Sequence, residues 1–431
     1  VLVSPFHREA ALCGTCHDVS NPAFSNDGNG NFVPNAFDTP ATDFGAGEIM
    51  AVERTYSEWF HSAYNSPGGI FNPAMGGNNP NVGSCQDCHM RDVTGHGCND
   101  PAAPVRTDLP LHDLTGGSTW IPTVLAQIDP TLDQTMLAEG ILRARYMLQN
   151  AATLDVQVDG HTLNVTVTNE TGHKLPTGYP EGRRMWLNVK FFDGSLSLLE
   201  ESGAYDPVTA VLAHDEALKL YEIEPATDGI PTLPDSTLFH FVLNNTVIKD
   251  NRIPPRGFMN ANFDSFGGSP VGYAYPDGQH WDLTAYDIPT GAARAEVTLY
   301  YQSSSKEFIE FLRDENTTDT KGQVMYDLWA NNGKCPPEVM ATQAIEFGPV
   351  AVGDPVPPRR TVLAQNTPNP FNPSTTIHFE LARGGHATLA VYDARGRVVK
   401  TILNEELPFG IYDYQWRGDD NAGKQVASGV Y

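Results

Sequence analysis

The sequence predicts a mainly β protein in three parts: a loop-rich N-terminal region with few helices, a central β-sandwich and a small C-terminal all-β domain. The 431 residues include 39 glycines and 33 prolines but only 18% charged residues, a composition typical of loop-rich and β-rich chains. From residue 154 onward, apolar and polar residues alternate, which is the period of a strand. A proline-rich stretch at 353–360 then divides the chain.

These observations predict four segments. Residues 1–152 form the loop-rich region, 153–352 the sandwich, 353–360 a linker and 361–431 the C-terminal domain. In the first segment, apolar residues at helical spacing predict helices at 48–64 and 131–152, the second capped by Asp129 with Pro130 in its first turn.

Period-two alternation predicts the strands of the other two segments. A hairpin is expected at 154–158 and 163–167, because Asp159 and Gly160 form a turn between two alternating runs. The remaining sandwich strands are expected at 185–192, 195–200, 217–224, 238–247 and 295–302, with helices at 306–313 and 323–329. The C-terminal strands are expected at 376–381, 386–392, 397–403, 410–416 and 425–431.

Two short motifs carry the chemistry of the first segment. Cys13, Cys16 and His17 have the spacing C-x-x-C-H, and Cys85, Cys88 and His89 repeat it. This is the pattern of covalent c-type haem attachment, in which two thiols bond the haem and the histidine is the proximal ligand of its iron. A zinc site or a chance match is the alternative, but structural zinc usually takes four Cys or His ligands in paired units. Two haem c groups are therefore predicted.

The two remaining cysteines, Cys98 and Cys335, are expected to form a disulfide, because paired thiols are typical of oxidising compartments. Such a compartment follows from the motifs, since covalent haem is attached outside the cytoplasmic membrane. We expect a protein that passes through the periplasm and acts extracellularly or at the cell surface. No apolar run is long enough for a membrane span. The net charge of −25 argues against nucleic acid as a partner.

Residues 1–350 resemble a group of exported multihaem c-type cytochromes. The resemblance rests on both C-x-x-C-H motifs, on residues 56–59 and on two longer stretches, 106–117 and 169–184. Members of that group differ in the number of haems per chain, and a chain with two motifs is at the low end of that range.

The resemblance and the local sequence suggest the sixth ligand of each iron. His112 and His173 lie within the two longer stretches, in Gly- and Pro-containing loops, and we expect them to be the distal ligands. The alternative is that each imidazole lies at the surface or hydrogen-bonds a haem propionate without binding the iron. The residues held in reserve are His7, His61 and His96. Arg183 and Arg184 are candidates for hydrogen bonds to haem propionates.

Residues 361–431 resemble the Ig-like C-terminal domain shared by flagellar hook-capping proteins and type IX secretion sorting signals. The matching residues lie at 366–373, 375–377, 391–399, 416 and 427–431. The resemblance implies export. A further strand usually follows the final Tyr in that family, and an unpaired strand edge is a natural contact for another subunit.

Together these features predict extracellular electron transfer through two bis-His haems, not catalysis. Expected partners are other cytochromes, further copies of the chain in a filament, and extracellular electron acceptors. One alternative is a multihaem redox enzyme of the nitrite or hydroxylamine type, with an open iron. Another is a surface scaffold or adhesin that uses haem only as a structural core.

Overall fold

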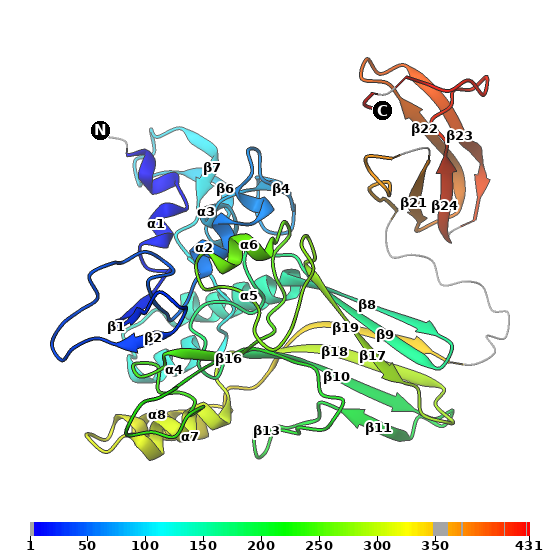
Figure 1. Ribbon diagram of the computed structural model, residues 1–431. Coiled ribbons are helices and arrows are strands. Elements are labelled where there is room, and N and C mark those ends of the chain that lie inside the picture. The colour runs from blue at the N-terminus through cyan, green and yellow to red at the C-terminus, as the bar shows by residue number, and fades with distance from the viewer. Residues whose placement is uncertain (1–3, 348–360, 372–373, 409, 428) are drawn as a thin grey trace. The chain divides into compact units, whose positions relative to one another are not determined.

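The computed structural model describes residues 4–347, 361–371, 374–408, 410–427 and 429–431. The chain forms two compact units, Val1–Phe347 and Gly348–Tyr431, and both are built mainly from strands (Figure 1). The predicted mainly β class is therefore confirmed. The predicted linker at 353–360 lies outside the described residues. Within the described part of the chain, no helix combines the length and the apolar character needed to cross a membrane.

The first third of the larger unit consists of short elements joined by loops. Its helical turns are η1 (Pro5–Arg8), α1 (Ala11–Gly14), α2 (Thr55–Phe60), η2 (Ala63–Asn65) and α3 (Cys85–His89). Its strands are β1 (Ser20–Asn26), β2 (Phe32–Pro34), β3 (Ile49–Ala51), β4 (Ile70–Phe71), β5 (Asn81–Val82), β6 (Asp92–His96) and β7 (Val105–Pro110).

The helix predicted at 48–64 is mostly wrong. The α-helix is limited to α2, followed by the 3-10 turn η2, because Ile49–Ala51 pairs with β1 instead. The buried Arg54 explains the break, since its guanidinium donates hydrogen bonds to the carbonyls of Val19 and Ala46, at 2.9 and 2.8 Å. These bonds hold the segment before α2 in an extended loop.

Two helices connect this region to the sandwich. α4 (Trp120–Ile128) was not predicted, whereas α5 (Gln134–Ala151) was. The cap of α5 is Asp133, whose carboxylate accepts from the backbone N–H groups of Thr135 and Met136, so the predicted cap Asp129 was wrong. α5 runs directly into the first sandwich strand, so any group held by its last turn is fixed to the sheets.

Two antiparallel sheets form the sandwich. One has the order β17-β9-β8, from β8 (Ala152–Asp159), β9 (Thr162–Asn169) and β17 (Trp281–Asp287). The other has the order β11-β10-β18-β19, from β10 (Arg184–Phe192), β11 (Leu198–Ser202), β18 (Arg294–Gln302) and β19 (Glu338–Glu346), with β14 (Leu220–Tyr221) also on β10.

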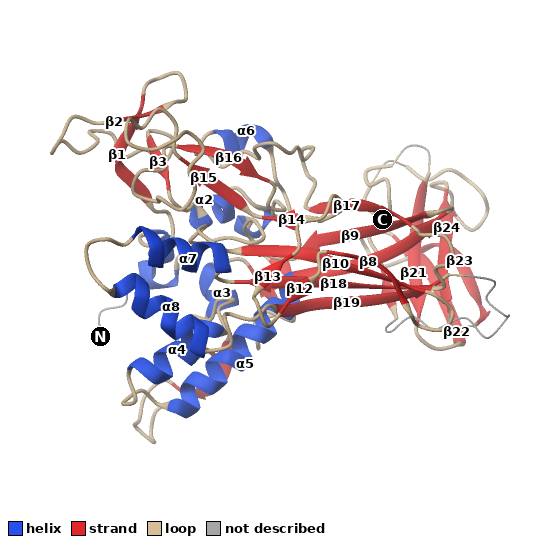
Figure 2. Cartoon of the chain, turned by 90° about the horizontal axis from the view of Figure 1, so that it is seen from below, coloured by secondary structure: helices blue, strands red, loops and turns tan. Residues whose placement is uncertain are grey.

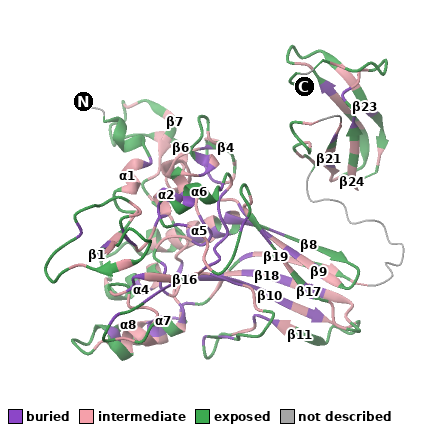
Figure 3. Ribbon diagram, viewed as in Figure 1, coloured by how far each residue is buried: buried purple, intermediate pink, exposed green. Residues whose placement is uncertain are grey.

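The two sheets share one apolar core. Inward residues of β9, such as Val165, contact inward residues of β10 and β18, such as Leu187 and Val297, and all three are fully buried. Figure 3 shows the buried segments along β10 and β18. The predicted hairpin and the strands at 185–192 and 295–302 are confirmed.

Shorter elements complete the larger unit. These are β12 (Tyr205–Asp206), β13 (Val211–Leu212), β15 (Ile223–Ala226), β16 (Thr246–Asp250), α6 (Asn260–Asp264), α7 (Lys306–Glu315) and α8 (Lys321–Asn331). The strand predicted at 238–247 is wrong for most of its length, because residues 240–244 form a hydrogen-bonded turn. Figure 2 shows α4, α5, α7 and α8 gathered at one end of the long strands.

The C-terminal unit contains a three-stranded sheet and a hairpin. The sheet has the order β20-β21-β24, from β20 (Val362–Leu363), β21 (Thr375–Leu381) and β24 (Gly410–Trp416). The hairpin joins β22 (Gly385–Tyr392) to β23 (Val398–Leu407). The strand predicted at 425–431 is not formed in the described residues, where Gln425 makes only a bridge to Asp419.

Candidate functional site

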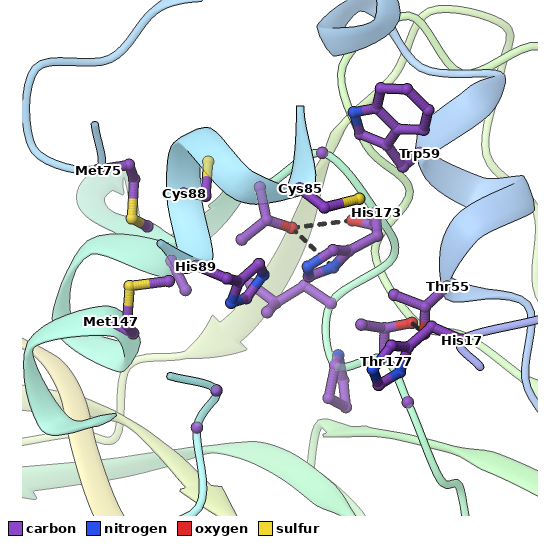
Figure 4. Close-up of a pocket in the computed structure, with 18 of the residues that line it drawn as sticks. His17, Thr55, Trp59, Met75, Cys85, Cys88, His89, Met147, His173 and Thr177 are labelled. Atoms are coloured by element: carbon purple, nitrogen blue, oxygen red, sulfur yellow. Dashed lines mark hydrogen bonds between the residues drawn. The ribbon is translucent and has the colours of Figure 1, made fainter. Parts of the chain in front are cut away.

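A cavity of about 290 Å³ brings the two C-x-x-C-H motifs together. Cys13 and His17 of the first motif line it, as do Cys85, Cys88 and His89 of the second (Figure 4). Cys16 is exposed and does not line it. Cys13 and Cys85 both line this cavity, so the motifs meet although they are far apart in sequence. Apolar walls come from Trp59, Tyr64, Met75, Met147, Leu148 and Leu175.

The second motif forms a short capped helix, α3. The Ser84 hydroxyl accepts from the Asp87 N–H at 3.1 Å, and the Asp87 carboxylate accepts from the Ser84 N–H at 2.8 Å, which is a capping box. One helical turn then places Cys85, Cys88 and His89 on the same face, because residues three and four apart are neighbours on a helix. Burial raises the pKa of both thiols to about 12.

The ring of His173 lies beside the ring of His89 inside this cavity (Figure 4). Their centroids are 6.3 Å apart and their planes differ by 20°. With a metal–imidazole bond of about 2 Å on each side, two rings that share one metal have centroids roughly 6 Å apart. The pair therefore has the separation of two axial ligands of one iron.

Hydrogen bonds leave the Nε2 atom of each ring available. His89 Nδ1 contacts the Thr115 carbonyl at 2.7 Å, and His173 Nδ1 contacts the Lys174 carbonyl at 2.9 Å. A backbone carbonyl on Nδ1 fixes the tautomer whose Nε2 carries a lone pair for a metal. Burial lowers the pKa of both imidazoles, that of His173 to about 4, which favours the neutral form that binds metals.

The loop that carries His173 is held by its own polar residues. Asn169, fully buried at the end of β9, donates from Nδ2 to the His173 carbonyl at 2.7 Å and to the Ile253 carbonyl at 2.9 Å. The Thr171 hydroxyl also donates to the His173 carbonyl, at 2.9 Å. Three hydrogen bonds to backbone carbonyls therefore fix the turn that directs the His173 imidazole into the cavity.

A buried ionic cluster anchors the other side of this loop. The fully buried Glu58 on α2 accepts from the Lys174 N–H at 3.0 Å and from the Thr177 hydroxyl at 2.7 Å, and Arg252 lies 3.3 Å from its other oxygen. Lys174 Nζ and Arg252 each pair with Asp250 at 2.7 Å. Two acids and two bases are balanced there, which is the condition for burying charge.

Sequence reasoning assigned no role to Glu58, Asn169 or Asp250. A local signal existed for Glu58, which interrupts a run of aromatic residues on α2 with a carboxylate. Its partners Lys174 and Arg252 lie far along the chain, so only the fold reveals the cluster.

The first motif is more open than the second. It spans the end of α1 and the following turn, and Gly14 is required there because a Cβ atom would lie 2.7 Å from the ring of Tyr56. The His17 side chain is 61% exposed, and its Nδ1 lies 3.3 Å from the Glu53 carboxylate. A carboxylate on Nδ1 also orients an imidazole for metal binding through Nε2.

The other predicted ligands lie elsewhere. His112 is exposed and does not line the cavity, although the backbone N–H groups of its neighbours Leu111 and Thr115 donate to the carbonyls of Arg91 and His89. His7 and His96 are exposed, and His96 Nδ1 contacts the Ala103 carbonyl. His61 stacks on Phe266 with centroids 5.5 Å apart. Leu114, Gly116 and Gly117 of the loop after His112 line the cavity, but His112 itself does not.

Arg183 and Arg184 have different surroundings. Arg183 lines the cavity and donates from one terminal nitrogen to the Thr177 carbonyl. Arg184 is buried in β10, where its Nε donates to the Gln302 side chain at 2.9 Å. The structure therefore places Arg183 alone of the two at the cavity wall.

The predicted disulfide between Cys98 and Cys335 is absent from the structure. Both are free cysteines, Cys98 exposed and Cys335 buried. The Cys335 sulfur lies 3.4 Å from the Ser303 hydroxyl, next to β18. Cys335 packs with Trp120, Ile309 and Trp329 in a core of its own, while Cys98 lies on a surface loop, which separates the two thiols.

The donor set fits a haem better than a bare metal ion. Among the described residues, no group of three or more His, Cys, Asp or Glu side chains is arranged to hold a metal ion. Structural zinc takes four such ligands. A haem iron takes only axial ligands from the protein, and His89 with His173 supplies two.

Comparison with known proteins gives two likenesses. Residues 366–431 match the FlgD Ig-like domain family. The penta-heme cytochrome c552 from Thermochromatium tepidum, a crystal structure, is 17% identical with a TM-score of 0.40, over 79% of this chain and 57% of that one. The chain thus spans a little over half the length of that cytochrome. No curated protein matches the chain. The smaller unit therefore carries a FlgD Ig-like domain.

Proposed function

We propose that this chain is a dihaem c-type cytochrome that transfers electrons outside the cytoplasmic membrane. The observation that carries the proposal is the pairing of His89 with His173 at 6.3 Å, in a cavity lined by both C-x-x-C-H motifs. Motif, ring separation and Nδ1 contacts are independent features, and each suits an axial ligand of haem iron.

The residues that would hold the cofactors follow from the site. Cys85 and Cys88 would bond one haem with His89 and His173 as its axial ligands, and Cys13 and Cys16 would bond the other with His17. When bound, each haem supplies one-electron redox chemistry. Arg183 at the cavity wall is the candidate for a propionate contact.

The protein would contribute rigidity and low polarity. The Glu58 cluster and Asn169 hold the His173 loop, so that the ligand keeps its place in both oxidation states. Apolar walls that include Trp59 and Met147 would lower the polarity around the haem of the second motif. Second-shell hydrogen bonding and burial are recognised controls of haem potential.

Charge and domain organisation support a choice of partners. A net charge of −25 favours redox partners with basic surfaces and disfavours polyanions. The FlgD Ig-like domain is proposed to serve export or assembly at the cell surface, with other cytochromes, copies of the chain, or external acceptors as electron partners. Transfer, not catalysis, is the proposed role.

The proposal is tested with the purified full chain from a host that matures c-type cytochromes. A haem-stained denaturing gel is expected to show covalent haem, and a spectroscopic redox titration is expected to show reversible reduction. The variants Cys13→Ala/Cys16→Ala and Cys85→Ala/Cys88→Ala should each halve the haem stain. Chains without covalent haem, or haems that cannot be reversibly reduced and oxidised, would overturn it.

A further inference from the structure

The two motifs share a cavity but have unequal sets of ligands. Three histidines among the described residues line it: His17, His89 and His173. Two irons with two imidazoles each would need four. The 6.3 Å pairing uses His89 and His173 together, so His17 is left without a second imidazole among the described residues that line the cavity.

The groups on the His17 side of the cavity are weak or unavailable as iron ligands. Thr55 and Thr177 lie near His17 (Figure 4), and their hydroxyls hydrogen-bond each other at 3.0 Å. The Arg183 guanidinium keeps its proton and has no lone pair to offer. The methionines Met75 and Met147, whose thioethers are known haem ligands, lie on the His89 side (Figure 4).

Tyrosine, the remaining common ligand, is also engaged. The Tyr64 hydroxyl donates to the Glu170 carbonyl at 2.6 Å. The Tyr56 ring packs against Gly14 within the first motif itself. Tyr301 is 6% exposed and belongs to the sandwich core. The Tyr64 hydroxyl is thus engaged by a carbonyl, and the rings of Tyr56 and Tyr301 pack in the first motif and in the sandwich core.

Solvent reaches His17 directly. Its side chain is 61% exposed, and the neighbouring Cys16 is exposed as well. The first motif therefore lies at the surface of the larger unit, where a haem held by it would border solvent.

We propose that the haem of the first motif binds a small exogenous ligand at its iron, whereas His173 closes the haem of the second motif. This inference rests on the dihaem function proposed above and adds a ligand site to it. The ligand class is a small molecule that coordinates haem iron end-on, for which carbon monoxide is the probe on the reduced protein.

The test is a carbon monoxide titration of the reduced full chain, made on the monomeric fraction after two covalent haems per chain have been measured. Because one iron keeps an open position, we expect about one carbon monoxide per chain, half of the haem. The variant His173→Ala opens the second iron and should take up about twice as much. His112→Ala, an exposed histidine outside the cavity, is the matched control and should behave as the parent.

The outcomes separate the two proposals. Absence of covalent haem would overturn the dihaem function. Two haems with no uptake of carbon monoxide would overturn only the open site, as would uptake by both haems of the parent chain. If His173→Ala fails to retain its haem, the stoichiometry of the parent chain decides alone.

Discussion

The two C-x-x-C-H motifs have the same sequence pattern but different surroundings. The second begins in a capping box, is enclosed by Tyr64, Met75 and Met147, and faces His173. The first spans the end of a four-residue helix and the following turn, has an exposed cysteine, and carries an exposed histidine oriented by Glu53. In our proposal, the short motif alone specifies covalent attachment of a haem, whereas the ligands of each iron would depend on loops that are distant in sequence.

The structural support of the two motifs also differs. The His173 loop follows β9 and is anchored to α2 and to residues 250–254. The surroundings of His17 come from residues 53–55 and 177–183, and its own side chain is 61% exposed. In our proposal, the rigid support of the His173 loop suits an electron carrier at the second motif. The exposure of His17 suits a ligand-binding site at the first motif.

The largest expected difference concerns loss of each haem. Cys85→Ala/Cys88→Ala should abolish attachment of the haem that packs against the enclosed apolar wall. The empty space left there should lower the free energy of unfolding by on the order of 3 kcal/mol or more. Cys13→Ala/Cys16→Ala should cost clearly less, because its site is open. Denaturant unfolding of both variants measures the difference, and equal losses would contradict the comparison.

The next effect concerns the axial ligand. His173→Met replaces an imidazole by a thioether, which should raise the potential of the second haem by on the order of 0.1 V, within the roughly 0.8 V that axial ligands span. His112→Met, at an exposed position, should leave both potentials unchanged. A redox titration checks this; an unchanged titration curve in His173→Met would remove His173 from the ligand set.

A third effect concerns the anchor of the His173 loop. Glu58→Ala leaves Arg252 with one fewer partner and frees the Lys174 N–H, so unfolding free energy should fall by about 3–5 kcal/mol, the usual cost of breaking a buried pair. Glu58→Gln keeps an acceptor for Lys174 and Thr177 and should cost less.

The matched control is Asp314→Ala, which breaks an exposed pair with Arg313 and should change stability little. A low-spin signal from the second haem that weakens in Glu58→Ala, but not in Asp314→Ala, would show that Glu58 positions the ligand. If both variants keep the full signal, Glu58 is structural only.

The smallest effect is a pH dependence near the first motif. Glu181 lies between Gly178 and Arg183 of the cavity wall, and burial raises its pKa to about 7. The folded chain then binds a proton more tightly than the unfolded chain between pH 4.5 and 7. Stability is therefore present below this window and falls as pH rises through it.

Glu181→Gln should remove that part of the pH dependence, on the order of 1–3 kcal/mol between pH 5 and 8. Unfolding curves at several pH values measure it. Equal slopes for parent and variant would mean that Glu181 ionises normally in the folded chain.

The sequence predicts the parts of the fold and site that depend on short spacing. The two motifs, the 154–167 hairpin and the strand at 295–302 follow from local pattern. β17 was not predicted, because its buried face carries the charged Asp282 as well as Tyr286. The alternation of apolar and polar residues is therefore not visible in the sequence. The strand predicted at 238–247 was wrong because Phe239 has a positive φ of 69° and packs on α7.

Long-range contacts explain what the sequence could not predict at the site. His173 was selected from its loop and its resemblance, but its separation from His89 is a property of the fold. The same local reasoning selected His112, which lies at the surface. The Glu58 cluster joins three segments that are distant in the sequence, so the local sequence around each of them gives almost no sign of it.

The central claim is that one cavity holds two haems, one closed by two imidazoles and one open. Low-temperature electron paramagnetic resonance of the oxidised monomer tests it most directly. Our account predicts a low-spin signal of the bis-histidine type and a high-spin signal of equal weight. Two low-spin signals, or no haem signal, would contradict it.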